Sequence, residues 1–236
     1  MDKTITVYHE KFSVMSPEAI IGSLLEDNPG RVVFSSSLGA EDQVITHMMA
    51  ALMKDPPVFT LDTGRLFYET LELVEKTNQR YAINIKVLFP DTKLVEEMVA
   101  LGGINLFYHS VENRKRCCHV RKIEPLKRAL KGSKFWITGL RREQSPTRKD
   151  LQFAEWDASN HIIKVNPLLD WSEDQVWDYI KTHNVPYNSL HDKGYRSLGC
   201  QPCTRQVMPG EDVRAGRWWW EQPETRECGL HKANKA

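Results

Sequence analysis

Most of the chain alternates between short apolar stretches and longer segments in which apolar residues recur at helical spacing. The apolar stretches are residues 31–36, 57–62, 83–88, 135–140 and 162–165. Buried strands separated by amphipathic helices assemble into a parallel sheet with helices on both faces. We therefore predict an α/β fold with an open, mostly parallel sheet.

Two capping signals mark helix starts. Ser16 followed by Pro17 predicts a helix that ends near Asn28, and Ser172 with Gln175 forms a capping box for a helix reaching about residue 183. Further helices are expected up to residue 53 and over 68–80, 93–101 and 117–130. From Pro186 onward Pro, Gly and charged residues dominate, so we expect loops. We predict an α/β domain over 1–207 and a mobile tail over 208–236.

Charge and hydropathy exclude several classes of partner. The 236 residues hold 32 Lys and Arg against 31 Asp and Glu, so no bulk field favours nucleic acid or a membrane surface. We see no apolar run long enough to cross a bilayer and no signal peptide core after Met1. The sequence predicts a cytoplasmic protein with reduced thiols, and it allows a homo-oligomer.

Four of the five cysteines come in pairs, Cys117-Cys118 and Cys200-x-x-Cys203. Four thiolates can hold zinc or an iron–sulfur cluster. Adjacent cysteines chelate one tetrahedral ion awkwardly but can reach two irons of a cube, which favours [4Fe-4S]. Zinc and four unrelated thiols are the alternatives.

The fifth cysteine, Cys228, stands alone in a polar segment near the end of the chain. A lone thiol in such a segment suits a nucleophile or a redox shuttle. Our hypothesis is that Cys228 attacks a substrate held by the rest of the protein. An incidental thiol is the alternative.

Ligands of open parallel sheets bind beyond the carboxyl ends of the strands. Three loops are predicted to lie there. The first has hydroxyls and N–H groups at a helix start, the second a carboxylate and a tight turn, and the third several guanidinium groups suited to phosphate or sulfate. They are Ser35-Ser36-Ser37-Leu38-Gly39, Leu61-Asp62-Thr63-Gly64, and Gly139 to Arg148 with Arg141, Arg142 and Ser145. The first is no Walker loop, because the Gly-Lys-Ser/Thr ending is absent.

Cations lie on both sides of the first cysteine pair in the sequence. A cluster with four thiolates would repel an anionic substrate by several kcal/mol even at an effective dielectric of ~20. Arg116, Arg121 and Lys122 could offset that repulsion. The alternative is that they form the solvated side of a helix.

Together these motifs resemble the assimilatory adenylyl-sulfate/phosphoadenylyl-sulfate reductase family. The resemblance covers nearly the whole chain and includes Lys115-Arg116-Cys117-Cys118, Gly199-Cys200-x-x-Cys203-Thr204 and Glu227-Cys228-Gly229-Leu230-His231. It implies a fold related to the ATP pyrophosphatases and the other adenine nucleotide alpha hydrolases. Residues 37–42 depart from the pyrophosphate loop of those enzymes, which argues against ATP cleavage.

The resemblance implies a chemistry in two exchanges. Cys228 would attack the sulfate sulfur of adenylyl sulfate and expel AMP, and a dithiol protein such as thioredoxin would release sulfite from the Cys228 S-sulfonate. A [4Fe-4S] cluster on Cys117, Cys118, Cys200 and Cys203 would position charge without transferring electrons. The implied substrate-binding set is Ser35, Ser36, Ser37, Gly39, Leu61, Asp62, Arg121, Lys122, Gly139, Arg141, Arg142, Ser145, Arg148, Arg214, Arg217 and His231.

Three alternatives stay open. Family members with both cysteine pairs usually take adenylyl sulfate, whereas the 3′-phosphorylated substrate would make the chain a PAPS reductase. A tRNA thiolation enzyme would need an intact pyrophosphate loop and a broader basic surface. A non-enzymatic metal-binding module would use the tail cysteine as a redox sensor. The run Trp218-Trp219-Trp220 has no role in any of these hypotheses.

Overall fold

The computed structural model describes residues 3–145, 148–222 and 225–226. These residues form two compact units. The first comprises residues up to 60, 69–86 and 132–189, and the second comprises 61–68, 87–131 and the described residues from 190 onward. Each unit is described separately below.

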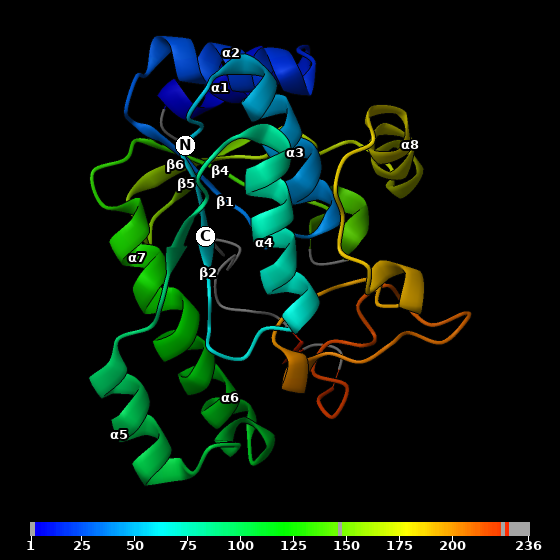
Figure 1. The fold of residues 1–236 in the computed structure, drawn as a ribbon. Helices are drawn as coiled ribbons and strands as arrows, with labels where there is room; N and C mark the ends of the chain where they lie inside the picture. Colours follow the sequence, from blue (N-terminus) through cyan, green and yellow to red (C-terminus); the bar gives the residue numbers. More distant parts are fainter. Residues whose placement is uncertain (1–2, 146–147, 223–224, 227–236) are drawn as a thin grey trace. The chain divides into compact units, whose positions relative to one another are not determined.

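A six-stranded sheet organises the fold, in the order β3-β2-β1-β4-β6-β5 (Figure 1). Its strands are β1 (Val32–Ser35), β2 (Val58–Leu61), β3 (Lys86–Leu88), β4 (Phe135–Ile137), β5 (Ala154–Asp157) and β6 (Ile162–Val165). Phe34 pairs in parallel with Val58 of β2 and with Ile137 of β4. Strand β1 thus lies between β2 and β4, and the reversal of strand order beside β1 is a topological switch point, where such sheets bind ligands.

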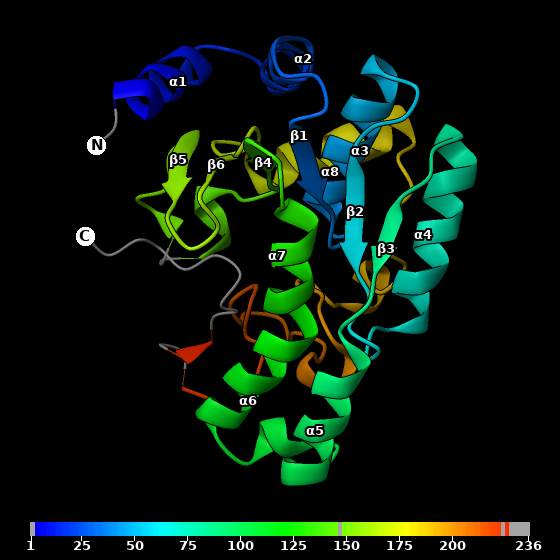
Figure 2. The same cartoon turned by 90° about the vertical axis from the view of Figure 1, so that its left-hand side faces the viewer.

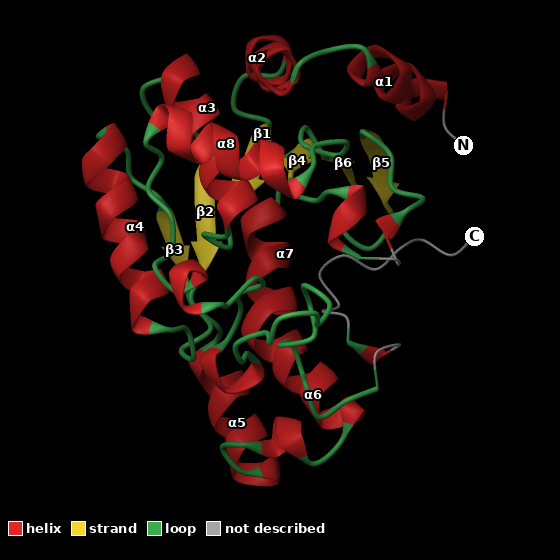
Figure 3. Cartoon of the chain, turned by 90° about the vertical axis from the view of Figure 1, so that its right-hand side faces the viewer, coloured by secondary structure: helices red, strands yellow, loops and turns green. Residues whose placement is uncertain are grey.

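The helices of the first unit pack against the sheet. Side chains of β1 and β4 are buried in the resulting core. The helices are α1 (Lys3–Ser13), α2 (Pro17–Asp27), α3 (Ala40–Leu52), α4 (Tyr68–Tyr81) and α8 (Glu173–His183), with the short η3 (Arg142–Gln144) after β4. Figures 2 and 3 show α3, α4 and α8 along one face of the sheet. The core includes Phe34, Ile45 and Ile137, each with no exposed surface.

The second unit is built from helices and loops around its own core. Its elements are α5 (Thr92–Gly102), η1 (Leu106–Tyr108), α6 (Val111–Cys118), η2 (His119–Ile123), α7 (Glu124–Leu130), η5 (His191–Lys193) and η6 (Gln201–Cys203). Met98, Leu106, Phe107 and Trp218 are buried there together with two of the cysteines. The core of this unit and its cysteine site are therefore one structure.

The predicted α/β class with an open, mostly parallel sheet is confirmed, with three differences in its elements. Helix α1 was not predicted, because only Ile5 and Phe12 of its residues are buried. Strand β5 was not predicted because it is a half-exposed antiparallel edge strand carrying charged residues. The cysteine helix begins at Val111 instead of Cys117, where Ser110 caps it. Among the described residues, no helix is long and apolar enough to cross a membrane.

Candidate active site

Helix α6 places the first cysteine pair at its carboxyl end. Its start is fixed by the Ser110 hydroxyl, which accepts the Asn113 N–H at 3.1 Å. Two turns later the chain reaches Cys117, which is half-buried, and Cys118, which is buried. The cap sets where the helix begins and therefore which face carries the two thiols.

The second pair lies at η6, which is tied to other parts of the second unit on both sides. The Gln201 N–H donates to the Arg65 carbonyl at 2.8 Å, and the Tyr108 hydroxyl donates to the Pro202 carbonyl at 2.7 Å. The Cys203 N–H closes the turn on the Cys200 carbonyl at 2.9 Å. These bonds hold the Cys-x-x-Cys turn against α6 and η1.

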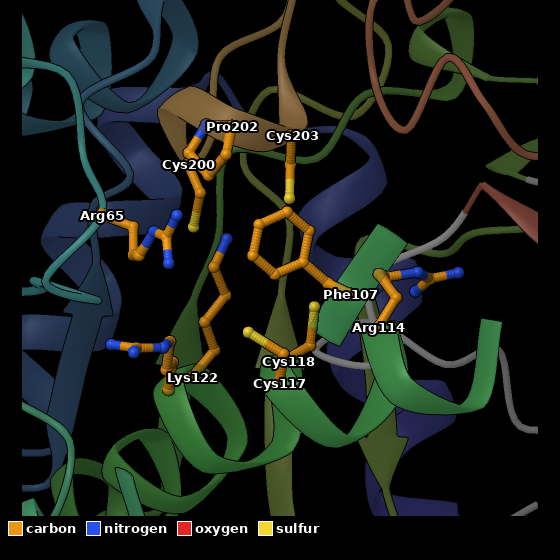
Figure 4. Close-up of a pocket in the computed structure, with 10 residues that line it drawn as sticks. Arg65, Phe107, Arg114, Cys117, Cys118, Lys122, Cys200, Pro202 and Cys203 are labelled. Carbon is orange, nitrogen blue, oxygen red and sulfur yellow. The ribbon is translucent and has the colours of Figure 1, made fainter. Parts of the chain in front are cut away.

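All four paired cysteines line a single cavity within the second unit. Figure 4 shows Cys200 and Cys203 pointing from η6 toward Cys117 and Cys118 on the helix. The other lining residues are Arg65, Phe107, Arg114, Arg121, Lys122 and Pro202.

Two of the thiols in this cavity, Cys117 and Cys203, are disfavoured as free thiolates. Burial, and next the neighbouring Cys200, raise the pKa of Cys203 to about 12. Burial also raises the pKa of Cys117, against the opposing effect of the Arg121 guanidinium. Buried thiols of this kind ionise only when a cationic group such as a metal binds them. The four thiols around this cavity could therefore act as ligands of a metal ion or a metal cluster.

Buried N–H donors in the second unit suit an anionic iron–sulfur cluster; of their residues, Arg121 lines the cavity and Trp218 packs in one apolar cluster with Cys118 and Cys203. Three N–H groups in the described part of the second unit are buried without a partner, namely Arg121 Nε, Arg217 Nε and Trp218 Nε1, and sulfur atoms of a cluster could accept from such groups. No three ligands converge on one ion position anywhere in the described ranges.

A π-helical stretch, η2, follows the cysteines and orients the cations. The Glu124 N–H donates to His119 O, five residues back, and the next residue, Pro125, has no N–H to give. Arg121 is buried in this stretch, and its Nη1 donates to the Thr63 carbonyl at 2.7 Å. The Thr63 hydroxyl lies 3.2 Å from Cys200 Sγ. Arg121 thus connects the cysteine helix to the Leu61-Asp62-Thr63-Gly64 loop.

The side chains of that loop mainly stabilise the loop itself. Asp62 accepts the Gly64 N–H at 2.8 Å, and its own N–H donates to the Leu88 carbonyl at 2.9 Å. Gly64 has a φ of +68°, and a Cβ at this position would contact Arg121. A side chain there would therefore be strained. Leu61 is the last residue of β2. The substrate role of Leu61 and Asp62 stays a prediction.

In the first unit, the serine loop follows β1 and is held by a buried carboxylate. The Ser37 N–H and hydroxyl both donate to Asp42 at 2.6 Å, and the Ser36 hydroxyl accepts the Leu38 N–H at 3.1 Å. Ser35 accepts from the Trp136 indole at 2.7 Å. These bonds hold Leu38 at a φ of +61°, an unusual conformation for leucine.

The carboxylate changes how the loop can bind an anion. Burial raises the pKa of Asp42 to about 6, opposed by the hydrogen bonds from Ser37. Both donors of Ser37 are already used, which leaves the N–H groups in the first turn of α3 as the candidate anion donors. That helix begins after Gly39. The loop is thus a preorganised helix start, and the substrate roles of Ser35, Ser36, Ser37 and Gly39 stay predictions.

The arginine loop after β4 is fastened to the first unit. Arg141 is buried, and its guanidinium donates to Glu41 at 2.9 Å and to the Trp171 carbonyl at 3.0 Å. Arg142 donates to the Leu151 carbonyl and pairs with Asp170.

The rest of that loop is held in a similar way. Arg148 bonds to Gln144, and its N–H donates to the Ser145 carbonyl at 2.9 Å. A Cβ on Gly139 would collide with Asp42 Oδ1, so only glycine lets the two loops of the first unit approach. The substrate contacts of this loop stay predictions.

Two of the tail residues that we predicted to bind substrate donate hydrogen bonds to different backbone carbonyls. Arg217 is buried and donates to the Leu198 carbonyl at 2.7 Å, and Arg214 reaches the Arg226 carbonyl at 3.3 Å. Cys228 and His231 lie outside the described residues. Their roles as nucleophile and substrate-binding residue stay predictions.

Sequence reasoning missed several residues of the two loops and the cavity. Asp42, Arg65, Phe107 and Arg114 were not among the candidates, and Thr63 was noted only as part of its loop. Asp42 had one sequence signal, because it follows the serine loop within one helical turn. Phe107 and Arg114 gave none, because an apolar residue and a cation have no special spacing to the cysteines.

An open α/β sheet with an anion loop at its switch point, together with a buried four-cysteine cavity, defines a nucleotide-binding class of protein with a candidate metal cluster. The model of the phosphoadenosine phosphosulfate reductase domain matches residues 31–206. The chain belongs to this family.

Relatives and solved structures agree with that assignment. A protein named adenosine 5′-phosphosulfate reductase from Allochromatium vinosum is 55% identical over 201 residues, covering 85% of this chain and 78% of the relative. A protein of the same name from Agrobacterium fabrum is 52% identical over 204 residues, covering 86% and 78%. The phosphoadenylyl-sulfate reductase structure from Candida auris, a phosphate complex, has a TM-score of 0.73 at 27% identity, covering 88% and 98%.

A more distant likeness concerns the fold alone. FMN adenylyltransferase from Candida glabrata, in complex with FAD and inorganic pyrophosphate, has a TM-score of 0.56 at 16% identity, covering 98% of this chain and 82% of that one. This likeness is consistent with the predicted α/β fold.

Proposed function

We propose that the chain reduces adenylyl sulfate to sulfite and AMP in assimilatory sulfate reduction, in the cytoplasm, where thiols stay reduced. The observation that carries this proposal is the cavity lined by all four paired cysteines and four cationic side chains. It stands in a chain that is 55% identical to a protein named adenosine 5′-phosphosulfate reductase. Names of this kind support adenylyl sulfate over its 3′-phosphorylated form as the substrate.

The first step is nucleophilic. The Cys228 thiolate attacks the sulfur of the sulfate group, an S–S bond forms, and the bond between that sulfur and the bridging oxygen breaks. AMP leaves with the electron pair of the broken bond, and a Cys228 S-sulfonate remains. This exchange needs no external electrons.

The second step supplies the two electrons. A thiolate of a dithiol protein such as thioredoxin attacks the Cys228 sulfur, and sulfite departs with the electron pair of the S–S bond. The second thiol of the partner then resolves the mixed disulfide and restores the Cys228 thiol. The partner leaves oxidised, so the electrons balance.

We assign a [4Fe-4S] cluster to Cys117, Cys118, Cys200 and Cys203. When bound, it supplies a fixed local charge to the site. The orphaned N–H groups and the raised thiol pKa values support this assignment. Lys122 lines the same cavity, and Figure 4 shows its side chain extending toward Cys200. A cation there offsets the negative charge of the ligand set.

Nucleotide binding is assigned to the loops after β1 and β4. Both loops follow strands at the switch point, where open α/β sheets bind ligands. The N–H groups at the start of α3 suit a phosphate or sulfate oxygen, and the Asp42 bonds to Ser37 preorganise that turn. We infer that Arg141 mainly fixes this loop, because its guanidinium already bonds Glu41 and the Trp171 carbonyl.

The test compares the two candidate substrates. The cluster-containing protein is incubated with thioredoxin and its reductant, and with either adenylyl sulfate or its 3′-phosphorylated form, and sulfite is measured. We expect a kcat/KM at least about tenfold higher for adenylyl sulfate, a difference of about 1.4 kcal/mol. Equal values, or a preference for the 3′-phosphorylated form, would contradict the substrate assignment. Sulfite from neither would favour a non-enzymatic module.

A further inference from the structure

The first residue of the tryptophan run, Trp218, is buried in the core of the second unit, whereas Trp219 is exposed. Trp218 is 1% exposed and belongs to the same apolar cluster as Cys118 and Cys203. Its ring lies between two guanidinium groups, with Arg114 Cζ at 4.7 Å and Arg217 Cζ at 4.6 Å. Stacking of this kind fixes both the ring and the cations. The run is therefore attached at the cysteine cavity.

A buried ion pair adds a second attachment. Arg114 has no exposed surface, and Glu221 is 7% exposed. Arg114 Nε and Nη2 donate to the two carboxylate oxygens of Glu221 at 2.9 and 2.7 Å. Arg114 lies one helical turn before Cys117 and Cys118, so this bond joins the cysteine helix to the residues that precede the C-terminus.

The same guanidinium holds the chain four residues further on. Arg114 Nη2 also donates to the Thr225 carbonyl at 2.6 Å, and the Thr225 hydroxyl donates to Glu221 at 3.0 Å. The Arg226 side chain folds back, with Nε donating to the Glu221 carbonyl at 2.9 Å and Nη2 to the Trp219 carbonyl at 3.3 Å. Glu221, Thr225 and Arg226 thus form one hydrogen-bonded network on α6.

Such a hydrogen-bonded network adds little stability, but it can fix the position of the segment that it holds. Desolvating two charges offsets most of what their attraction returns, and fixed geometry is the best-attested use of buried ion pairs. Only residues 226 and 227 separate Thr225 from Cys228 in the sequence. While Thr225 is held, covalent geometry keeps the two Cα atoms within about 11 Å of each other.

We propose that Arg114 and Glu221 are positioning residues that fasten the base of the C-terminal segment to the cysteine helix and so limit where the Cys228 thiol can range. The positioning role rests on the proposed function. The attachment of the C-terminal segment to the cysteine helix does not rest on the proposed function, because it consists of hydrogen bonds that the structure shows within the second unit. Arg114 also lines the cysteine cavity, so the ligand set and the tail share one side chain.

Trypsin tests the fastening without substrate. Cleavage after Arg226 releases a peptide that begins at Glu227 and ends at or beyond Lys232, which mass spectrometry detects. The Arg226 side chain must leave its carbonyl partners before the protease can bind it, so cleavage reports the open fraction when protease is scarce. We expect cleavage to be on the order of ten- to a hundredfold faster in Arg114→Met and in the isosteric Glu221→Gln.

The matched control is Arg205→Gln. Arg205 makes a bidentate pair with Glu211 at 2.8 Å in the same C-terminal region, without contacting α6. We expect wild-type cleavage at Arg226 in this variant, with circular dichroism confirming that all variants are folded. Equal cleavage rates in the wild type, Arg114→Met and Glu221→Gln would overturn the fastening.

The positioning role has its own readout. In a single turnover with saturating adenylyl sulfate, we expect Glu221→Gln to slow formation of the Cys228 S-sulfonate about tenfold while the substrate Kd stays unchanged. An unchanged rate would overturn positioning. If the wild type forms no S-sulfonate, the proposed function fails, and the trypsin comparison still decides the fastening.

Discussion

A buried carboxylate shapes the anion loop of the first unit. Asp42 accepts the backbone N–H and the hydroxyl of Ser37, and Gly139 must lack a side chain so that Asp42 fits. The sequence alone indicated Ser37 as a direct ligand. In the structure the Ser37 N–H and hydroxyl donate to Asp42, and the substrate role of Ser37 stays a prediction.

The raised pKa of Asp42 predicts a pH dependence of stability. A carboxyl group with a pKa near 6 in the fold and 3.8 in the unfolded chain stabilises the fold while it is protonated. That contribution is lost as pH rises through about 6, and the total is about 3 kcal/mol. Asp42→Asn keeps an acceptor for Ser37 and removes the titration, so it should be the more stable protein at pH 8.

Urea unfolding between pH 4 and 8 measures this difference. The free energy of unfolding of Asp42→Asn minus that of the wild type should grow by about 2 kcal/mol as pH rises across this range, because part of the total is already lost at pH 4. Asp55→Asn, at an exposed position, should give no such trend. A difference that is independent of pH would show that Asp42 does not titrate as described.

At the scale of elements, local signals predicted what local chemistry determines. The Ser16-Pro17 start and the Ser172-Gln175 capping box were both found in the structure. The π-helical stretch η2 could not be predicted, because it depends on Pro125 together with a tertiary bond from Arg121 to Thr63. The predicted Cys117–Leu130 helix thus missed six residues at its start and the wider turn inside it.

Two serine caps give a matched test of the cysteine helix. Ser110 caps α6 in the second unit and Ser172 caps α8 in the first. Replacing either with alanine should lower the free energy of unfolding by about 1 kcal/mol. We expect only Ser110→Ala to accelerate loss of visible absorbance when an iron chelator is added. Equal rates of loss in both variants would show that the Ser110 cap does not stabilise the cluster site.

At the scale of the whole molecule, the open, mostly parallel sheet could be predicted from apolar periodicity, whereas the strand order that sets its switch point could not. The division into two units could not, because the second unit is assembled from three separate segments. Its core packs Trp218 against Cys118 and Cys203, a contact between residues that are far apart in sequence. The predicted boundary between residues 207 and 208 stays a prediction.

Cluster removal should therefore affect the second unit selectively. Without the cluster, Arg121, Arg217 and Trp218 keep buried N–H groups that need a partner. We expect amides of α6 and η6 to exchange hydrogen faster in chelator-treated protein and in Cys203→Ser, whereas those of β1 and β4 keep their protection. Unchanged protection in the second unit would contradict a cluster bound to these cysteines.

The central claim is that Cys228 carries the sulfonate. The cluster-containing protein is incubated with adenylyl sulfate in the absence of reductant, and its intact mass is then measured. The account predicts a gain equal to one sulfonate group in the wild type and no gain in Cys228→Ser. An unchanged wild-type mass with the cluster intact, or the same gain in Cys228→Ser, would contradict it.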